Sequence, residues 1–396
     1  MRQGDYPDGG GRPHHHSWRS HHQSRQRRAA HSRRLDQSQL MVSAGEQLFV
    51  SARRVAVEAV RQHVEQAAFL WAQRDSWGQK DPPDETVIGE IGERIEINLD
   101  GLRIAGAAAW PAAERQLKDF PDKGEFFVIG WMAIEQGDPS RMEEGVAAAK
   151  DVDERRGLIG AMGWHKPAKI AHLVRDWLVA PDAFKRYLAV GACLEHGVDP
   201  SKLLDRLVND PDATTRAFAL RLAGRLKRAD LAREMASALE SGHGIVRLWA
   251  GWALTELGSG DLARAELRKA AVAGGPDALT ALRGAIKAGP DKDVRTWMGG
   301  LMKSAATAPL AVRGIGMLGD RAILPWLIER MKEPNVAVAA CAAFLELFPE
   351  ARAETKMFTV DPTDLGPAFA EFFDDELVGI AVPDRVESWR AQNRVA

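Results

Sequence analysis

A cysteine and a histidine three positions apart are the residues of this sequence best suited to chemistry. Cys193 and His196 lie in "LAVGACLEHG", and this spacing puts both on one face of a helix. A thiol beside an imidazole is how many enzymes activate a cysteine nucleophile. The apolar neighbours favour the alternative, a cysteine that packs in a helical core. We therefore expect Cys193 to be structural.

Metal, cofactor and nucleotide chemistry have no matching motif. The other histidines of the body form neither HExxH nor a His-rich cluster. The glycines of "GSGDLARAE" (258–266) follow no strand, so a phosphate-binding turn is not expected there. The sequence therefore predicts no catalytic residue, no metal and no cofactor, and we expect no enzyme.

The charge of the chain is unevenly distributed. Residues 1–40 carry eight Arg and three Asp, a net charge of +5, whereas the other 356 residues carry 45 basic and 52 acidic side chains. Because phosphate backbones need a basic face, nucleic acid is an unfavourable partner for this acidic body. The two distant cysteines indicate a reducing compartment, and no apolar run reaches membrane-spanning length. We expect a cytoplasmic protein without a membrane partner.

The first forty residues differ from the rest in composition. They hold six of the eleven histidines and almost no aliphatic side chains. Such a segment cannot bury enough apolar surface to offset its ordering entropy, so we expect a disordered tail. It could bind metal or nucleic acid, or it could be upstream sequence translated in error, with Met41 as the true start.

Helical repeats organise the body of the chain. Proline or glycine breakers precede small-residue-rich apolar helices at Pro181, Pro211, Gly242, Pro276, Pro309 and Pro334. Shorter amphipathic segments such as "AILPWLIERMK" lie between them. A lone helix pair cannot bury its apolar face, but stacked pairs share one core. The pattern resembles the HEAT and HEAT-like repeat family over about 123–349, and it predicts an all-α, HEAT-like solenoid.

Basic residues occupy one equivalent position in several repeats: Arg186, Arg216, Arg247 and Arg313. In the first two repeats an Asp lies four residues earlier, where it can cap the helix while the arginine bonds it or a neighbouring turn. The arginines could form an anion-binding row along a groove, or they could join the repeats internally. Ala281 and Ala339 interrupt the row.

Tryptophan is abundant, with twelve residues. Trp249 and Trp252 are three apart in one repeat helix. We expect most tryptophans to be core, but an exposed one would be a natural anchor for a partner because tryptophan is enriched at interface hot spots.

The stretch "ERIEINLDGLRIAG" (93–106) raises the question of a site. Its apolar positions continue a helical stripe that begins at Ile88, and Asp84 and Gly106 are suitable start and stop residues. Asp100 and Arg103 can pair on the surface. Gly101 is unusual inside a helix, so close packing is expected there. These features indicate architecture.

Residues of this stretch, with "AAFLWAQRD" and "AAAWPAAERQL", resemble the N-terminal signature of a family of uncharacterised bacterial HEAT-repeat-like proteins, often encoded near type VI secretion loci. The signature residues that we expect to be structural are Phe69, Leu70, Trp71, Arg94, Leu99, Asp100, Gly101, Leu102, Arg103 and Gly106. The family often continues beyond the point that corresponds to Ala396, which raises the alternative of a truncated C-terminus with a bare apolar face. The predicted divisions are a tail (1–40), an N-terminal helical segment (41–120), the repeat solenoid (121–349) and a C-terminal extension (350–396).

The expected function is a non-catalytic scaffold that binds another protein. The resemblance implies a type VI secretion component as the partner and an adaptor or chaperone role. The candidate contact residues are the four row arginines with Trp249 and Trp252. Two alternatives remain: a HEAT-like enzyme of the lyase or DNA glycosylase type, and a structural module without a fixed partner from a truncated gene copy. The oligomeric state is not predicted.

Overall fold

The computed structural model describes residues 57–374, 376 and 378–394. The chain divides into two units, Met1–Arg61 and Gln62–Ala396. In the first unit the described residues are 57–61, which are helical. The predicted tail of residues 1–40 lies outside the described residues. The predicted divisions after residues 120 and 349 stay predictions.

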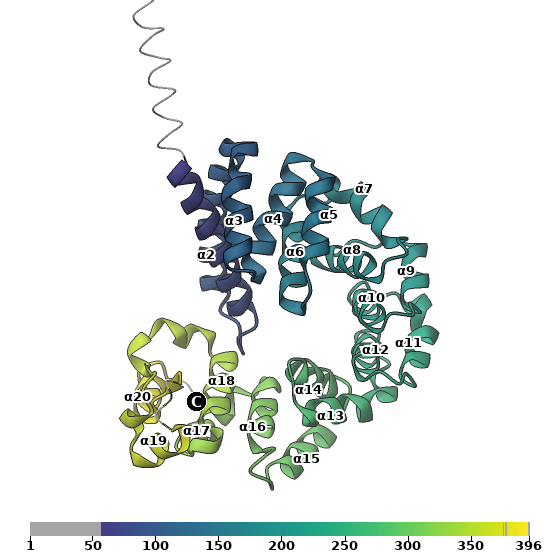
Figure 1. Ribbon diagram of the computed structural model, residues 1–396. Helices are drawn as coiled ribbons and strands as arrows, with labels where there is room; N and C mark the ends of the chain where they lie inside the picture. Colours follow the sequence, from purple (N-terminus) through teal and green to yellow (C-terminus); the bar gives the residue numbers. More distant parts are fainter. Residues whose placement is uncertain (1–56, 375, 377, 395–396) are drawn as a thin grey trace, which may run out of the picture. The chain divides into compact units, whose positions relative to one another are not determined.

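The second unit is a succession of α-helices (Figure 1). After a helical stretch over residues 62–78, its first helices are α2 (Glu85–Ala105), α3 (Trp110–Asp119), α4 (Lys123–Gln136), α5 (Pro139–Ala148), α6 (Val152–Trp164) and α7 (Pro167–Leu178). The middle of the unit contains α8 (Ala183–His196), α9 (Lys202–Leu207), α10 (Ala213–Arg225), α11 (Ala232–Ala238), α12 (Gly244–Glu256), α13 (Arg264–Ala273) and α14 (Ala278–Lys287). The last helices are α15 (Asp291–Leu301), α16 (Ala308–Met317), α17 (Leu324–Met331), α18 (Pro334–Leu347), α19 (Pro367–Phe373) and α20 (Pro383–Gln392).

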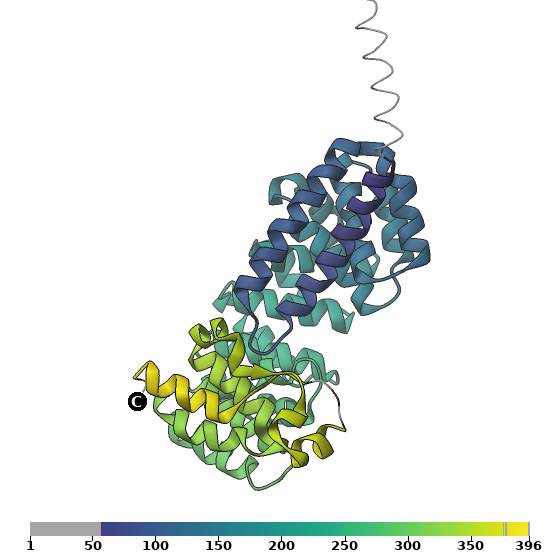
Figure 2. The same cartoon turned by 90° about the vertical axis from the view of Figure 1, so that its left-hand side faces the viewer.

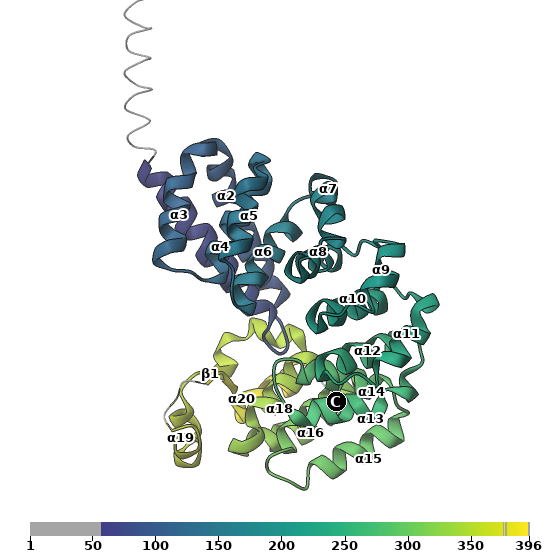
Figure 3. The same cartoon turned by 45° about the vertical axis from the view of Figure 1, so that its right-hand side comes forward.

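The helices of this unit form an inner and an outer row. Helices α8, α10, α12, α14 and α16 follow one another along the inner side of a curved path, with α7, α9, α11, α13 and α15 outside them (Figures 1 and 3). Consecutive inner helices pack directly on one another, including α8 on α10, α10 on α12 and α16 on α18. Stacking of this kind gives neighbouring pairs one shared core. The structure confirms the predicted all-α, HEAT-like solenoid.

Small residues permit the close packing of the inner row. A Cβ added at Gly224 of α10 would lie 2.6 Å from the Cα of Ala253 in α12. Any side chain there would force the two helices apart, because a packed interior has no room for added atoms. The glycine- and alanine-rich composition of the repeat helices follows from this contact distance.

The stretch that includes residues 93–106 is the second helix of an antiparallel pair (Figure 2). The Asp84 carboxylate caps α2 by accepting hydrogen bonds from the backbone N–H groups of Thr86 (3.1 Å) and Val87 (3.3 Å). Gly106 ends the helix with a φ of 55°, which glycine adopts without strain. The predicted start and stop are confirmed. The predicted stripe is buried, at Ile88, Ile91, Ile95, Leu99 and Leu102.

The C-terminal segment packs on the last repeat. Trp389 of α20 lies 5.6 Å from Phe344 and 5.7 Å from Phe348, between ring centroids, and both contacts are edge-to-face. Helix α20 thus covers apolar surface of α18. Two short strands, β1 (Phe358–Thr359) and β2 (Ile380–Ala381), pair antiparallel in the same region, with Phe358 opposite Ala381.

Candidate interaction surface

The row arginines lie one turn into the inner helices. The capping residues predicted for the first two repeats are present, since Asp182 accepts from the N–H of Phe184 (2.8 Å) and Asp212 from that of Thr215 (2.7 Å). Each cap fixes the first turn of its helix. The arginine that follows is thereby held beside the loop between successive helices.

Arg186 of α8 reaches into the next repeat. Its Nε and Nη2 donate to the two carboxylate oxygens of Asp210, at 2.7 and 2.9 Å, and its Nη1 donates to the carbonyls of Ala180 (2.9 Å) and Pro181 (2.8 Å). Hydrogen bonding to Asp210 raises the pKa of Arg186. This bidentate pair joins α8 to the loop before α10.

The next two arginines bond to loops and to an outer helix. Arg216 donates from Nε to the carbonyl of Val208 at 3.0 Å. Arg247 donates from Nε to Glu266 of α13 at 3.0 Å and from Nη1 to the carbonyl of Ser241 at 2.7 Å. Both side chains are half-buried. Part of each guanidinium group therefore still faces solvent.

Arg313 of α16 is the most buried of the four, with 2% of its surface exposed. Its Nη2 donates to Asp81 at 2.5 Å, and it also pairs with Glu346 of α18. Burial alone would lower the pKa of Arg313, but the two carboxylates outweigh it and the pKa is raised. A guanidinium held in this way has little surface left for a partner.

The two tryptophans of α12 differ in exposure. Trp249 is buried, with 4% of its surface exposed, whereas Trp252 is half-buried. Their rings meet edge-to-face with centroids 5.6 Å apart. The guanidinium of Arg221 lies 4.5 Å from the Trp249 ring centroid, a cation–π distance that sequence reasoning missed. The assignment of the four arginines and two tryptophans to partner binding stays a prediction.

The signature residues divide into packed and exposed ones. Trp71 is buried and stacks on Phe127, with centroids 5.0 Å apart. Leu70, Leu99 and Leu102 are also buried. Asp100 and Arg103 form the predicted surface pair on α2. Two members, in contrast, face solvent: Phe69 is 57% exposed and Arg94 is also exposed.

Gly101 has the close neighbour that its place in a helix suggested. A Cβ at this position would lie 2.4 Å from the His63 ring. The His63 ring is itself held, because its Nδ1 lies 3.0 Å from the Oδ1 of Asn98. The glycine thus lets the helix that contains His63 approach α2.

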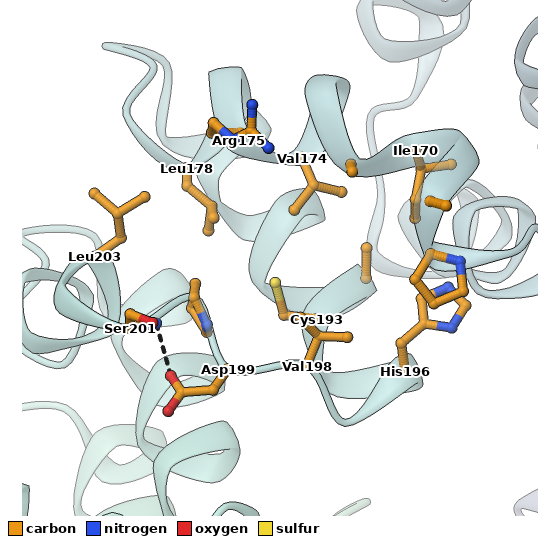
Figure 4. Close-up of a pocket in the computed structure, with 15 residues that line it drawn as sticks. Ile170, Val174, Arg175, Leu178, Cys193, His196, Val198, Asp199, Ser201 and Leu203 are labelled. Carbon is orange, nitrogen blue, oxygen red and sulfur yellow. Dashed lines mark hydrogen bonds between the residues drawn. The ribbon is translucent and has the colours of Figure 1, made fainter.

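Cys193 and His196 line an open, largely apolar cavity of about 460 Å³ between α7, α8 and α9 (Figure 4). Ile170, Val174 and Leu203 also line it. Burial raises the pKa of the Cys193 thiol to about 11, so the thiol is neutral at physiological pH. The Nε2 of His196 lies 3.1 Å from the carbonyl of Met162. The arrangement suits packing and apolar contact rather than nucleophilic attack.

The described part of the chain has neither a metal-binding cluster nor a membrane-spanning helix. No group of three or more His, Cys, Asp or Glu side chains gathers there in a way that could hold a metal ion. Within the same residues, no helix combines the length and the apolar character needed to cross a bilayer.

The class of protein that these features define is a helical-repeat protein. Residues 200–301, which run from just before α9 to the end of α15, match the family of HEAT repeats. No curated protein and no solved structure matches the chain. HEAT-like repeats are therefore supported by both the fold and a family match, and the match covers the helices that carry Arg216, Arg247, Trp249 and Trp252.

Proposed function

We propose that this chain is a non-catalytic scaffold that binds another protein along its solenoid. The observation that carries the proposal is the row of HEAT-like helix pairs, which the match over residues 200–301 supports independently. Repeats that contact only their neighbours form extended surfaces, and such surfaces suit long partners. A cytoplasmic location goes with this proposal.

The environment of the reactive side chains favours binding over catalysis. Cys193, the best nucleophile candidate of the sequence, has a thiol whose pKa is raised to about 11 by burial. A catalytic cysteine requires the opposite shift, toward the thiolate. HEAT repeats are moreover a class of module that usually binds proteins.

The partner we propose is a component of a type VI secretion system, with the chain acting as its adaptor or chaperone. The support is the resemblance of the segments around Trp71, Leu99–Gly106 and Trp110 to the signature described above. The contact residues we propose are the row arginines with Trp249 and Trp252. Trp249 and Arg313 are enclosed, whereas the other four residues are half-buried. Among the half-buried arginines, Arg247 has a side chain that is 25% exposed, against 13% for Arg186.

Affinity capture tests the scaffold and its partner together. The full chain carries a C-terminal tag, is incubated with lysate of its own cells, and is crosslinked before mass spectrometry. We expect a secretion component at near-stoichiometric yield, with crosslinks to α8–α16. An Arg247→Ala/Trp252→Ala double variant should recover less of it, whereas an Arg115→Ala variant, altered at an exposed residue of α3, should recover as much.

The outcomes distinguish the scaffold function from the assignment of its partner to a secretion system. Stoichiometric recovery of a protein outside secretion systems would retain the scaffold and overturn the secretion assignment. Recovery of chaperones and background alone would overturn both and favour a module without a fixed partner.

A further inference from the structure

The cavity that Cys193 and His196 line has the size of a small-molecule site. It has a volume of about 460 Å³ and lies between two outer helices, α7 and α9, and the C-terminal half of α8 (Figure 4). Cavities of several hundred Å³ are typical of sites for small ligands. The six residues proposed above to contact a protein partner lie elsewhere, with Arg186 near the other end of α8. The cavity therefore calls for an interpretation of its own.

The wall that α7 contributes is apolar and partly open to solvent. Pro167, Ala171, Val174 and Leu178 line the cavity, and their spacing puts them on one face of the helix. Leu178 is buried, whereas Ala171 is exposed and Val174 is half-buried. A ligand that covers the remaining apolar surface of this wall would gain free energy from its removal from water.

The other walls come from α8, from α9 and from the loop between them, and they are also apolar. Val198 of the loop is 43% exposed, and Leu203 of α9 is half-buried. Cys193 of α8 is 3% exposed and presents an uncharged thiol, because burial raises its pKa to about 11. The cavity therefore offers apolar contacts to a ligand from three helices.

Polar groups of the loop between α8 and α9 already have partners. The backbone N–H of Ser201 donates to the Oδ1 of Asp199 at 2.7 Å (Figure 4), and the Nη1 of Arg228 lies 3.1 Å from the same oxygen. The backbone N–H of Val198 donates to the carbonyl of Cys193 at 3.0 Å. A peptide backbone in the cavity would bring amide groups that these occupied groups cannot satisfy, and burying them unsatisfied costs free energy.

Arg175 of α7 brings a positive charge to this apolar cavity. Its exposed side chain lines the cavity beside Val174 and Leu178 (Figure 4). Among the residues that the structure describes, it has no partner in a hydrogen bond, an ion pair or a ring contact. Its neighbour Asp176 is exposed and lies outside the cavity lining. An anionic group of a ligand could therefore pair with Arg175 without displacing an existing contact.

We propose that this cavity binds an aliphatic carboxylic acid, with the hydrocarbon chain between the apolar walls and the carboxylate paired with Arg175. A molecule with one charged group and an apolar chain matches a cavity with apolar walls and an unpaired cation. The site is additional to the scaffold function proposed above and does not depend on it.

The test measures displacement of a fluorescent probe, undecanoic acid with a terminal dansyl group, from the full chain at pH 7.4. The competitors are hexanoate, octanoate and the uncharged 1-octanol. We expect octanoate to bind about tenfold more tightly than hexanoate, because the walls cover two further methylene groups. Octanoate should also bind about fivefold more tightly than 1-octanol, which is the upper range for an exposed ion pair.

Three variants locate the site. Arg175→Gln should weaken octanoate about fivefold and leave 1-octanol unchanged, a difference that a misfolded chain would not produce. Ala171→Trp places a large side chain at an exposed position of the α7 wall, so it should fill the cavity and abolish binding of both competitors. Arg115→Gln, at an exposed arginine of α3, should bind both like the unaltered chain.

Several results would overturn the proposal. They are a probe that does not bind, equal effects of Arg175→Gln and Arg115→Gln on octanoate, and unchanged binding in Ala171→Trp. Stronger displacement of the probe by a twelve-residue peptide that contains leucine and glutamate than by octanoate would overturn it in favour of a protein ligand. None of these results changes the outcome of the lysate capture, so the cavity and the scaffold function are judged separately.

Discussion

Asp81 and Arg313 lie 232 positions apart in the sequence and are joined by a hydrogen bond of 2.5 Å between Oδ1 and Nη2. The contact holds the loop that follows residue 78 against α16. Arg352 secures the same loop, because its Nη2 donates to the carbonyl of Pro82 at 3.0 Å. The Nη2 of Arg283 lies 3.7 Å from the Oδ1 of Asp81. The first helix pair of the second unit is therefore tied to its later repeats by a charged contact as well as by the intervening stack.

Removal of Asp81 should destabilise the chain more than removal of a surface partner. In Asp81→Ala, the buried Arg313 keeps only Glu346, so we expect the free energy of unfolding to fall by about 2–3 kcal/mol, somewhat less than for a fully enclosed pair. The measurement is urea unfolding followed by circular dichroism. The control is Glu350→Ala, whose pair with Arg321 is about half exposed on both sides and should change stability by less than about 1 kcal/mol. Equal effects of the two variants would show that the Asp81 contact does not tie the unit together.

Gly101 should not tolerate a side chain, whereas Gly89 of the same helix should. The Cβ of Gly101→Ala would meet the His63 ring, so we expect a loss of about 1–3 kcal/mol from displacement of that ring. Gly89 of α2 has no atom within 4 Å of such a Cβ, so Gly89→Ala should stabilise by up to about 1 kcal/mol through helix propensity. A His63→Ala/Gly101→Ala double variant should recover part of the loss in a double-mutant cycle. Additive effects in that cycle would mean that His63 is not what the glycine accommodates.

The elements of this fold could be predicted from local patterns. The buried stripe of α2, its Asp84 cap and its Gly106 stop follow from helical periodicity and from the φ that glycine permits. The inner helices could be located because each begins near a proline or glycine breaker. These signals act within one or two turns, and their meaning does not depend on the rest of the chain.

The partners of the charged side chains could not be predicted in the same way. The position of Arg313 in its repeat was evident, but nothing in the sequence links it to Asp81, because their contact is a product of how the whole unit curves. The same limit applies to Arg221 and Trp249, which lie on different helices and meet at 4.5 Å. The spacing of Arg221 and Trp249, about one repeat, is the only local signal of their contact. Phe69 shows the converse, a signature residue that periodicity cannot place because it lies off the buried stripe.

His165 should make stability depend on pH between about 6.5 and 4. Burial lowers its pKa to about 4, and the charges of Lys169 and Arg103 act in the same direction while Glu135 opposes them. The unfolded chain binds a proton at His165 below pH 6.5, whereas the folded chain does so only near pH 4. Its contribution is therefore complete above pH 6.5 and is lost as the pH falls to 4, by up to about 3 kcal/mol.

The contribution of His165 can be isolated by substitution. In His165→Gln the amide can still donate to the carbonyl of Trp131, which lies 3.1 Å from the imidazole Nε2, but it does not titrate. Urea unfolding at pH 7.5, 6, 5 and 4.5 should show the unaltered chain losing stability faster than the variant. Parallel curves would mean that the imidazole is protonated as readily in the folded chain as in the unfolded one.

Both cysteines should resist alkylation until the chain unfolds. Burial raises the thiol pKa to about 11 for Cys193 and for Cys341. At pH 8 the thiolate fraction is then about a hundredfold below that of a thiol with a pKa of 9, and burial limits access further. Iodoacetamide labelling read by mass spectrometry should find neither residue modified in the folded chain and both modified in 8 M urea. Rapid labelling of Cys193 alone under folding conditions would indicate an activated thiol beside His196, and it would restore the enzyme alternative that the scaffold proposal sets aside.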